Sequence, residues 1–191
     1  MDPKIEGNGN NGEIRLPEVP VLVLGGDEAF WLTAEGEIEK TSLKIAATKV
    51  MQQPPLVVHR LSVARRLGVN PFPAFDLLEL YAFTFPARQC LPTARGIARA
   101  AGLTPSADPE EQTLALFEAA HYVLSFLTGL KDKNRKSASE IAMTMGRAGW
   151  NWAPSVLAAL GLPETQDRFG GLDVWRNLSE WKIWTWKIQK L

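Results

Sequence analysis

The chain has 191 residues, of which 46% are hydrophobic, and its 21 Lys and Arg residues balance 21 Asp and Glu residues. This length suits one domain of ordinary size, or one domain with an appendage. The formal net charge of zero excludes a global field that would draw the protein to nucleic acid or to a membrane. Any such attraction must therefore come from a local patch.

The N-terminal residues and the single cysteine indicate a reducing compartment. Residues 1–12 are polar and lack the apolar core of a signal peptide, and no apolar run approaches the ~20 residues of a membrane span. Cys90 alone excludes an intramolecular disulfide, and we expect it to be a partly buried thiol. We therefore expect a cytoplasmic protein without membrane partners. Residues 1–18 should be disordered, because they offer little apolar surface.

Short apolar runs separated by turn residues predict the strands. The first is the almost wholly apolar run at residues 19–24, and a Gly-containing turn joins the second and third strands at 28–33 and 37–41. Ser42 can cap a helix that Pro54 ends, and residues 56–58 form a fourth strand. A meander followed by a crossover predicts an α/β fold with a mixed sheet of four or five strands, flanked by helices.

Capping residues predict the helices that follow. We expect helices at about 61–67, 76–85, 94–101 and 109–130. The last begins with Asp108 as N-cap, Pro109 in the first position and acids in the first turn. Its buried stripe should contain Leu114, Phe117, His121 and Leu124.

The charged segment Lys131–Lys136 predicts a break between a domain at residues 19–130 and a small helical extension at 137–191. Ser137 to Glu140 fit a capping box, and helices should follow to about residue 148 and over 154–161. The extension holds six of the seven Trp residues but only about 55 residues, too few for a stable core of its own. We therefore expect it to pack on the first domain.

Few residue patterns point directly to chemistry. The chain contains no Walker sequence, no paired C-x-x-C and no H-E-x-x-H, which excludes those nucleotide and zinc sites. His59 follows a predicted strand, where α/β proteins place functional groups, although a structural hydrogen bond is the alternative. His121 should be a core residue.

Two sets of residues could contact nucleic acid. Arg60, Arg65 and Arg66 flank the fourth strand and could bind phosphate, or they could form a solvated face. Near the C-terminus, Trp residues alternate with Lys residues, which suits base stacking but also suits a small aromatic core. The candidates there are Trp181, Trp184 and Lys187.

The order of elements, with PPLVVHR before a short helix and FDLLEL after it, resembles the DnaQ-like, DEDD-type exonucleases of the RNase H-like class. Four longer stretches are similar to the N-terminal region of DinG-type ATP-dependent DNA helicases of alphaproteobacteria. These stretches are VNPFPAFDLLELYAFTFPAR, LPTARGIARAAGL, MGRAGWNWAPSVLAALGLPE and LDVWRNLSEW. The resemblance covers roughly residues 17–181 and implies a helicase motor as a partner domain.

The resemblance also implies which residues carried the chemistry. Active members of the family use four acids to hold two metal ions. Here Gly25-Gly26-Asp27 stands in place of the first acidic pair, and the motif beginning at His59 ends at Ala64 in place of its Asp. Glu118 best matches the acid of the last helix, with Thr113 in place of the preceding His. Asp76 matches a position that is usually not a metal ligand in this family.

The loss of acids leads to three hypotheses. The favoured one is a non-catalytic, exonuclease-like module with no metal and no cofactor, in which Asp27, Glu118 and His59 are vestigial. It would position single-stranded or forked DNA or pack on the motor. The second is a divergent Mg- or Mn-dependent DNA exonuclease. The third is a truncated helicase fragment without a function of its own.

Overall fold

The computed structural model describes residues 12–162 and contains a mixed sheet of five strands. The strands run in the order β3-β2-β1-β4-β5. β1 pairs antiparallel with β2, which pairs antiparallel with β3, whereas β1, β4 and β5 are parallel. Their bounds are Val21–Leu24, Glu28–Leu32, Ile38–Ser42, Leu56–Val57 and Phe75–Asp76. The predicted α/β fold with a mixed sheet is confirmed.

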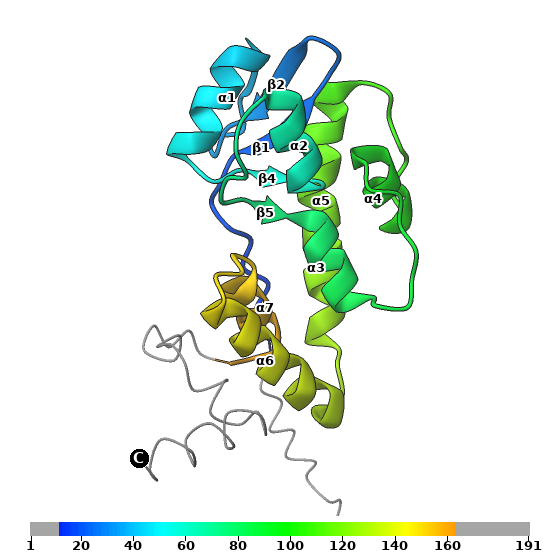
Figure 1. Cartoon of the computed structure of the whole chain (residues 1–191). Helices are drawn as coiled ribbons and strands as arrows, with labels where there is room; N and C mark the ends of the chain where they lie inside the picture. Colours follow the sequence, from blue (N-terminus) through cyan, green and yellow to red (C-terminus); the bar gives the residue numbers. More distant parts are fainter. Residues whose placement is uncertain (1–11, 163–191) are drawn as a thin grey trace, which may run out of the picture.

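Helices cover both faces of this sheet (Figure 1). In residues 12–162 they are α1 (Leu43–Gln52), α2 (Arg60–Leu67), α3 (Leu77–Thr84), α4 (Ala94–Ala100), α5 (Pro109–Thr128), α6 (Asp132–Arg147) and α7 (Ala153–Ala159). The predicted caps Ser42, Thr93 and Asp108 each accept a backbone N–H of the first turn. None of the helices among these residues is long and apolar enough to cross a membrane.

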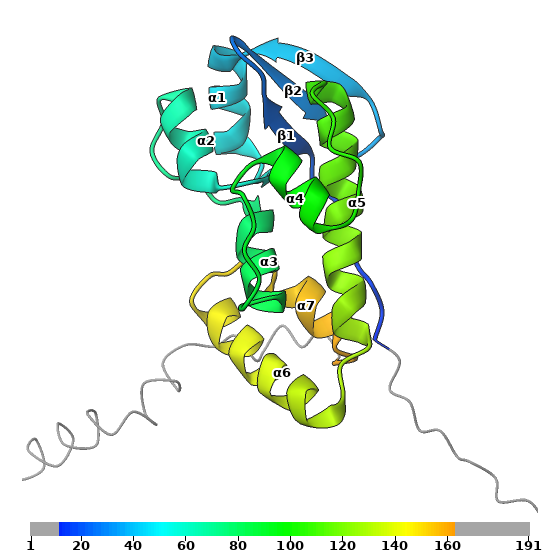
Figure 2. The same cartoon turned by 90° about the vertical axis from the view of Figure 1, so that its right-hand side faces the viewer.

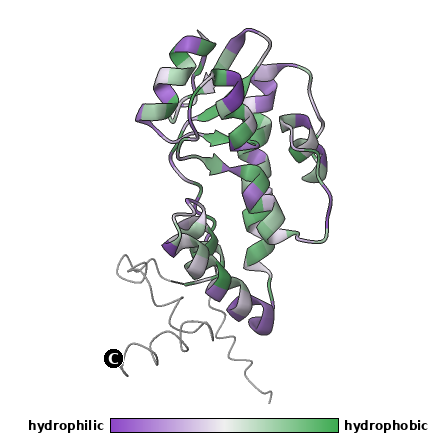
Figure 3. Cartoon of the chain, in the orientation of Figure 1, coloured by the Kyte–Doolittle hydropathy of each residue, from purple (hydrophilic) through white to green (hydrophobic). Residues whose placement is uncertain are grey.

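The alternation of side chains along β1 divides the core into two layers. Val21 and Val23 point to the side covered by α3 and α5, where the larger cluster lies. Leu22 points to the side covered by α1 and α2 and packs with Trp31 and Val50. Colouring by hydropathy shows the strands mostly hydrophobic and the first turns of α6 mostly hydrophilic (Figure 3).

The buried face of α5 differs from the predicted stripe. Leu114 and Phe117 are 49% and 43% exposed, and His121 is exposed. The predicted core role of His121 is therefore wrong. The helix instead buries small and branched residues against the sheet, because the close approach of a helix to a sheet leaves little room for large rings. The buried positions are Thr113, Leu116, Ala119, Ala120, Val123, Leu124 and Leu127.

The charged segment Lys131–Lys136 is not a break. Lys131 is the N-cap of α6, and the rest of the segment forms the first turns of a helix that continues to Arg147. The predicted capping box at Ser137 therefore lies inside this helix, where the preceding turn already satisfies its N–H groups. The charged side chains are compatible with a helix because most of them face solvent.

The free edge of β5 is covered by the loop between α6 and α7. Trp152, which is fully buried, donates its indole N–H to the carbonyl of Asp76 at 2.9 Å. Asn151 donates its amide to the carbonyl of Ala74 at 3.0 Å. These two carbonyls point away from β4, so the two side chains supply hydrogen bonds that a sixth strand would otherwise give. The ring of Trp152 also packs edge-on against Phe75 at 5.2 Å.

Residues 12–18 contact the core, although we expected disorder through residue 18. Ile14 and Leu16 pack against the larger cluster. The N–H of Glu13 donates to the carbonyl of Ala158 at 3.0 Å. The segment therefore packs against the end of α7 before the chain enters β1. Residues 132–162 share one core with the sheet.

Replacing Trp152 by Phe should lower the free energy of unfolding by about 2–3 kcal/mol. The change leaves the Asp76 carbonyl without a donor and opens a small cavity. Urea unfolding followed by far-UV circular dichroism measures the loss. Trp150→Phe is the matched control, because the Trp150 indole makes no hydrogen bond to the β5 edge, where Trp152 donates to Asp76. A loss in the control equal to that in Trp152→Phe would contradict the role of the edge hydrogen bond.

Candidate functional site

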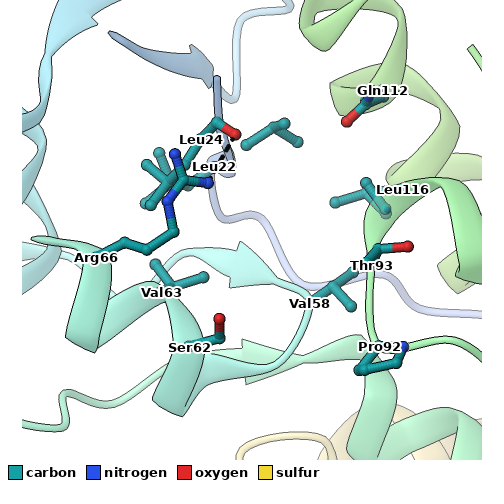
Figure 4. Close-up of a pocket in the computed structure, with 12 residues that line it drawn as sticks. Leu22, Leu24, Val58, Ser62, Val63, Arg66, Pro92, Thr93, Gln112 and Leu116 are labelled. Atoms are coloured by element: carbon teal, nitrogen blue, oxygen red, sulfur yellow. Dashed lines mark hydrogen bonds between the residues drawn. The ribbon is translucent and has the colours of Figure 1, made fainter. Parts of the chain in front are cut away.

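A hollow of about 250 Å³ lies at the carboxyl ends of β1 and β4 (Figure 4). The carboxyl edge of parallel strands is where α/β proteins place ligands and reacting groups. The hollow is lined by residues of β1, α2, the start of α4 and α5. They are Leu22, Val23, Leu24, Val58, Ser62, Val63, Arg66, Pro92, Thr93, Ala94, Gln112 and Leu116.

Arg66 closes one side of this hollow. Its guanidinium donates to the carbonyls of Leu24 and Gly26, each at 3.2 Å, and to the carbonyl of Gly25. One side chain of α2 thus satisfies three carbonyls at the end of β1 and holds the Gly25-Gly26 turn against the helix. The result is a fixed positive charge beside the place where a metal-dependent enzyme would need negative oxygen ligands.

The other polar groups of the hollow are neutral. Gln112 donates its amide to the carbonyl of Ser106 at 3.0 Å, which ties α5 to the loop before it. Thr93 caps α4 by accepting the N–H of Gly96 at 3.0 Å. Ser62 projects from α2 (Figure 4). Asp, Glu, His and Cys do not line the hollow, and no group of three or more such residues that could hold a metal occurs in residues 12–162.

The structure does not bring the two vestigial acids together at this hollow. Asp27 and Glu118 are both exposed, and neither lines it. On α5 the positions that face the hollow are Gln112 and Leu116, whereas Glu118 lies six residues after Gln112 and points elsewhere at 3.6 residues per turn. Gln112 is thus the α5 side chain that sequence reasoning missed.

The structure places the last residue of the second motif away from the hollow. Ala64, the residue in place of the motif's Asp, is buried with Trp31 on the opposite face of the sheet. The positions of α2 that face the hollow are Ser62, Val63 and Arg66. The arginine that lines the hollow is therefore Arg66, whereas Arg60 does not line it.

His59 lies beside a buried carboxylate that organises the neighbouring backbone. Asp76 is 4% exposed and accepts the N–H groups of His59 at 2.9 Å, Arg60 at 2.7 Å and Leu78 at 3.0 Å. His59 has a φ of 59° and a ψ of 69°, the left-handed region that costs a non-glycine residue about 1–2 kcal/mol. The bonds to Asp76 stabilise that conformation, so this part of the site is structural.

Arg60 belongs to a different hollow, of about 520 Å³, between α3 and the end of α6. It donates to the carbonyl of Phe72 at 3.3 Å and lines this hollow with Glu79 and Trp150. Partial burial and the Asp76 carboxylate raise the pKa of Glu79, while Arg60 and the nearby Trp150 indole lower it. Of the predicted trio, the structure thus places Arg66 at the first hollow, Arg60 at the second and Arg65 at neither.

Three further exposed arginines follow α3 in the sequence. Arg88, Arg95 and Arg99 are exposed, on the segment before α4 and on α4 itself. The sequence carries a signal for them, because residues 59–107 contain six Arg, no Lys and only two acids. The predicted contacts Trp181, Trp184 and Lys187 lie outside the described residues.

Comparison with protein-family models, with curated proteins and with solved structures returns no match for this chain. The fold and the site define its class: an α/β protein with a mixed five-stranded sheet, whose carboxyl edge carries a hollow lined by one arginine and no acid.

Replacing Asp76 by Asn should lower the free energy of unfolding by about 3 kcal/mol. An amide offers one oxygen instead of two, and its NH₂ group would face a backbone donor. Thermal and urea unfolding measure the loss. Asp27→Asn makes the same chemical change at an exposed position and should stay within about 0.5 kcal/mol of wild type. Equal stability of the two variants would contradict the organising role of Asp76.

Replacing Glu79 by Gln should stabilise the protein at neutral pH. A carboxyl whose pKa is raised on folding contributes fully to stability below its unfolded pKa, and that contribution is lost as pH rises through the folded pKa. A Gln side chain stays neutral at every pH, so the variant keeps its stability as pH rises. Unfolding measured at pH 4 and at pH 7 should therefore show a larger advantage of the variant at pH 7, and a greater advantage at pH 4 would contradict the sign.

Proposed function

We propose that this chain is a non-catalytic, exonuclease-like module of the RNase H-like class that positions DNA or packs on a helicase motor. The order of its elements supports the proposal. An antiparallel meander is followed by parallel strands β4 and β5, and the 20-residue helix α5 packs along β1 and β2. This is the arrangement on which the resemblance to the DnaQ-like exonucleases rests.

The single observation that carries the non-catalytic part is the content of the hollow at the carboxyl edge. Two divalent cations a few ångströms apart need several anionic oxygens to offset their repulsion. The lining side chains offer a guanidinium, two hydroxyls and an amide instead. Asp27 and Glu118 are exposed and do not contribute.

The DNA-binding part is supported by charge. The chain is neutral as a whole, yet the stretch from residue 59 to residue 107 carries six Arg against two acids. One of those acids, Asp76, is buried and occupied by three N–H groups. A local excess of positive charge of this kind is the footprint expected of phosphate binding. A DinG-type helicase motor is the partner domain that we propose for the full protein.

Gel-shift titration with single-stranded and forked DNA tests the binding. The wild-type chain should bind both at low salt, with an affinity that falls steeply as salt is raised, because phosphate contacts release counterions. No binding up to high micromolar protein would contradict DNA positioning and leave packing on the motor as the surviving form of the proposal.

Incubation of labelled DNA with the protein and manganese tests the absence of catalysis. We expect no cleavage above a protein-free sample. Cleavage that Asp27→Asn abolishes would overturn the proposal in favour of a divergent nuclease. Cleavage that persists in this variant and is removed by further purification would identify a contaminant.

A further inference from the structure

Exposed arginines stand on both α2 and α4. Figure 2 looks onto α4, with α2 on one side and α5 on the other. Arg65 on α2 and Arg95 and Arg99 on α4 are exposed, and none of them pairs with a carboxylate in the described part of the chain. Unpaired guanidinium groups repel each other, so their concentration on these two helices favours a polyanionic ligand.

Exposed aromatic rings lie along α5. Tyr122 and Phe126 are 38% and 45% exposed, and their rings lie 6.4 Å and 4.8 Å from the ring of Phe85. The guanidinium of Arg88 lies 4.7 Å from the centre of the Phe85 ring. Phe85 is itself buried and supports the two outer rings from below.

The segment 85–93 joins the aromatic rings to the arginines of α4. It begins at Phe85, beside Phe126, and ends at Thr93, the N-cap of α4. It also lies directly against α4, because a Cβ on Gly96 would stand 2.3 Å from the carbonyl oxygen of Leu91. One segment, packed against α4, therefore links the exposed rings to the helix that carries Arg95 and Arg99.

We propose that a surface made by Arg65, Arg88, Arg95, Arg99, Tyr122 and Phe126 binds single-stranded DNA. The inference rests on the proposed function and names its ligand form and its residues. The arginines contact the phosphates, and the rings of Tyr122 and Phe126 stack with unpaired bases, which offer a π-face whatever their sequence. In a duplex the base faces are stacked on each other, so a duplex uses only the arginines.

Fluorescence anisotropy with a labelled 20-nucleotide single strand and a blunt duplex of the same sequence tests the surface. The double variant Arg95→Gln/Arg99→Gln should weaken binding to both and lower the salt slope for the single strand by roughly 1.4, at about 0.7 per phosphate contact. The double variant Tyr122→Leu/Phe126→Leu should weaken single-strand binding about tenfold or more and leave duplex binding unchanged.

A matched control removes the same charge elsewhere. Lys133→Gln/Lys136→Gln changes two exposed cations on α6 and should bind both DNA forms like wild type. Circular dichroism and unfolding of every variant separate loss of binding from loss of fold. Where the Leu double variant unfolds, the single change Tyr122→Leu replaces it and should weaken single-strand binding while leaving duplex binding unchanged.

The outcomes distinguish this inference from the proposed function. If wild type binds neither DNA form, both fail together, and self-association abolished by the Leu variant would instead identify a protein interface. If wild type binds but the α4 and α6 variants weaken binding equally, this surface is wrong and the proposed function stands. If the Leu variant weakens duplex and single-strand binding equally, base stacking is wrong.

Discussion

The rest of the described structure depends on one buried carboxylate, that of Asp76. Its two oxygens accept backbone N–H groups from the start of α2 and from the first turn of α3, while its own carbonyl accepts the indole N–H of Trp152. One residue at the end of β5 thus joins the sheet, two helices and the α6–α7 loop. It also holds His59, the N-cap of α2, in a left-handed conformation that turns the backbone from β4 into the helix. An acid that looks like an active-site residue is here a structural one.

The carboxyl edge of the sheet is organised by a cation of the protein itself. Arg66 donates to the carbonyls at the end of β1 and so holds the Gly25-Gly26 turn against α2. Ser62, Thr93 and Gln112 provide polarity without charge around the remaining space. A hollow with this lining suits neutral hydrogen-bonding groups and lacks the anionic oxygens that divalent cations prefer.

Charge is distributed unevenly in a chain whose net charge is zero. The stretch that contains α2, α4 and the segment between α3 and α4 is rich in arginine, whereas residues 13–58 carry seven acids against four bases. Such a separation orients the molecule in the field of a polyanion and leaves its total charge unchanged. Surface electrostatics here are a property of the fold, since α2 and α4 are brought together only by the sheet and α5.

The sequence by itself determined the elements whose signals are local. The meander, the α1 cap at Ser42, the Pro54 stop and the start of α5 at Asp108 all follow from neighbouring residues. Only the tertiary structure decided which face of α5 is buried, that Lys131–Lys136 is helical, and that Arg66 rather than Arg60 lies at the carboxyl edge. These depend on contacts between segments 40 or more residues apart, such as Arg66 with Gly25 and Trp152 with Asp76, which no local pattern encodes.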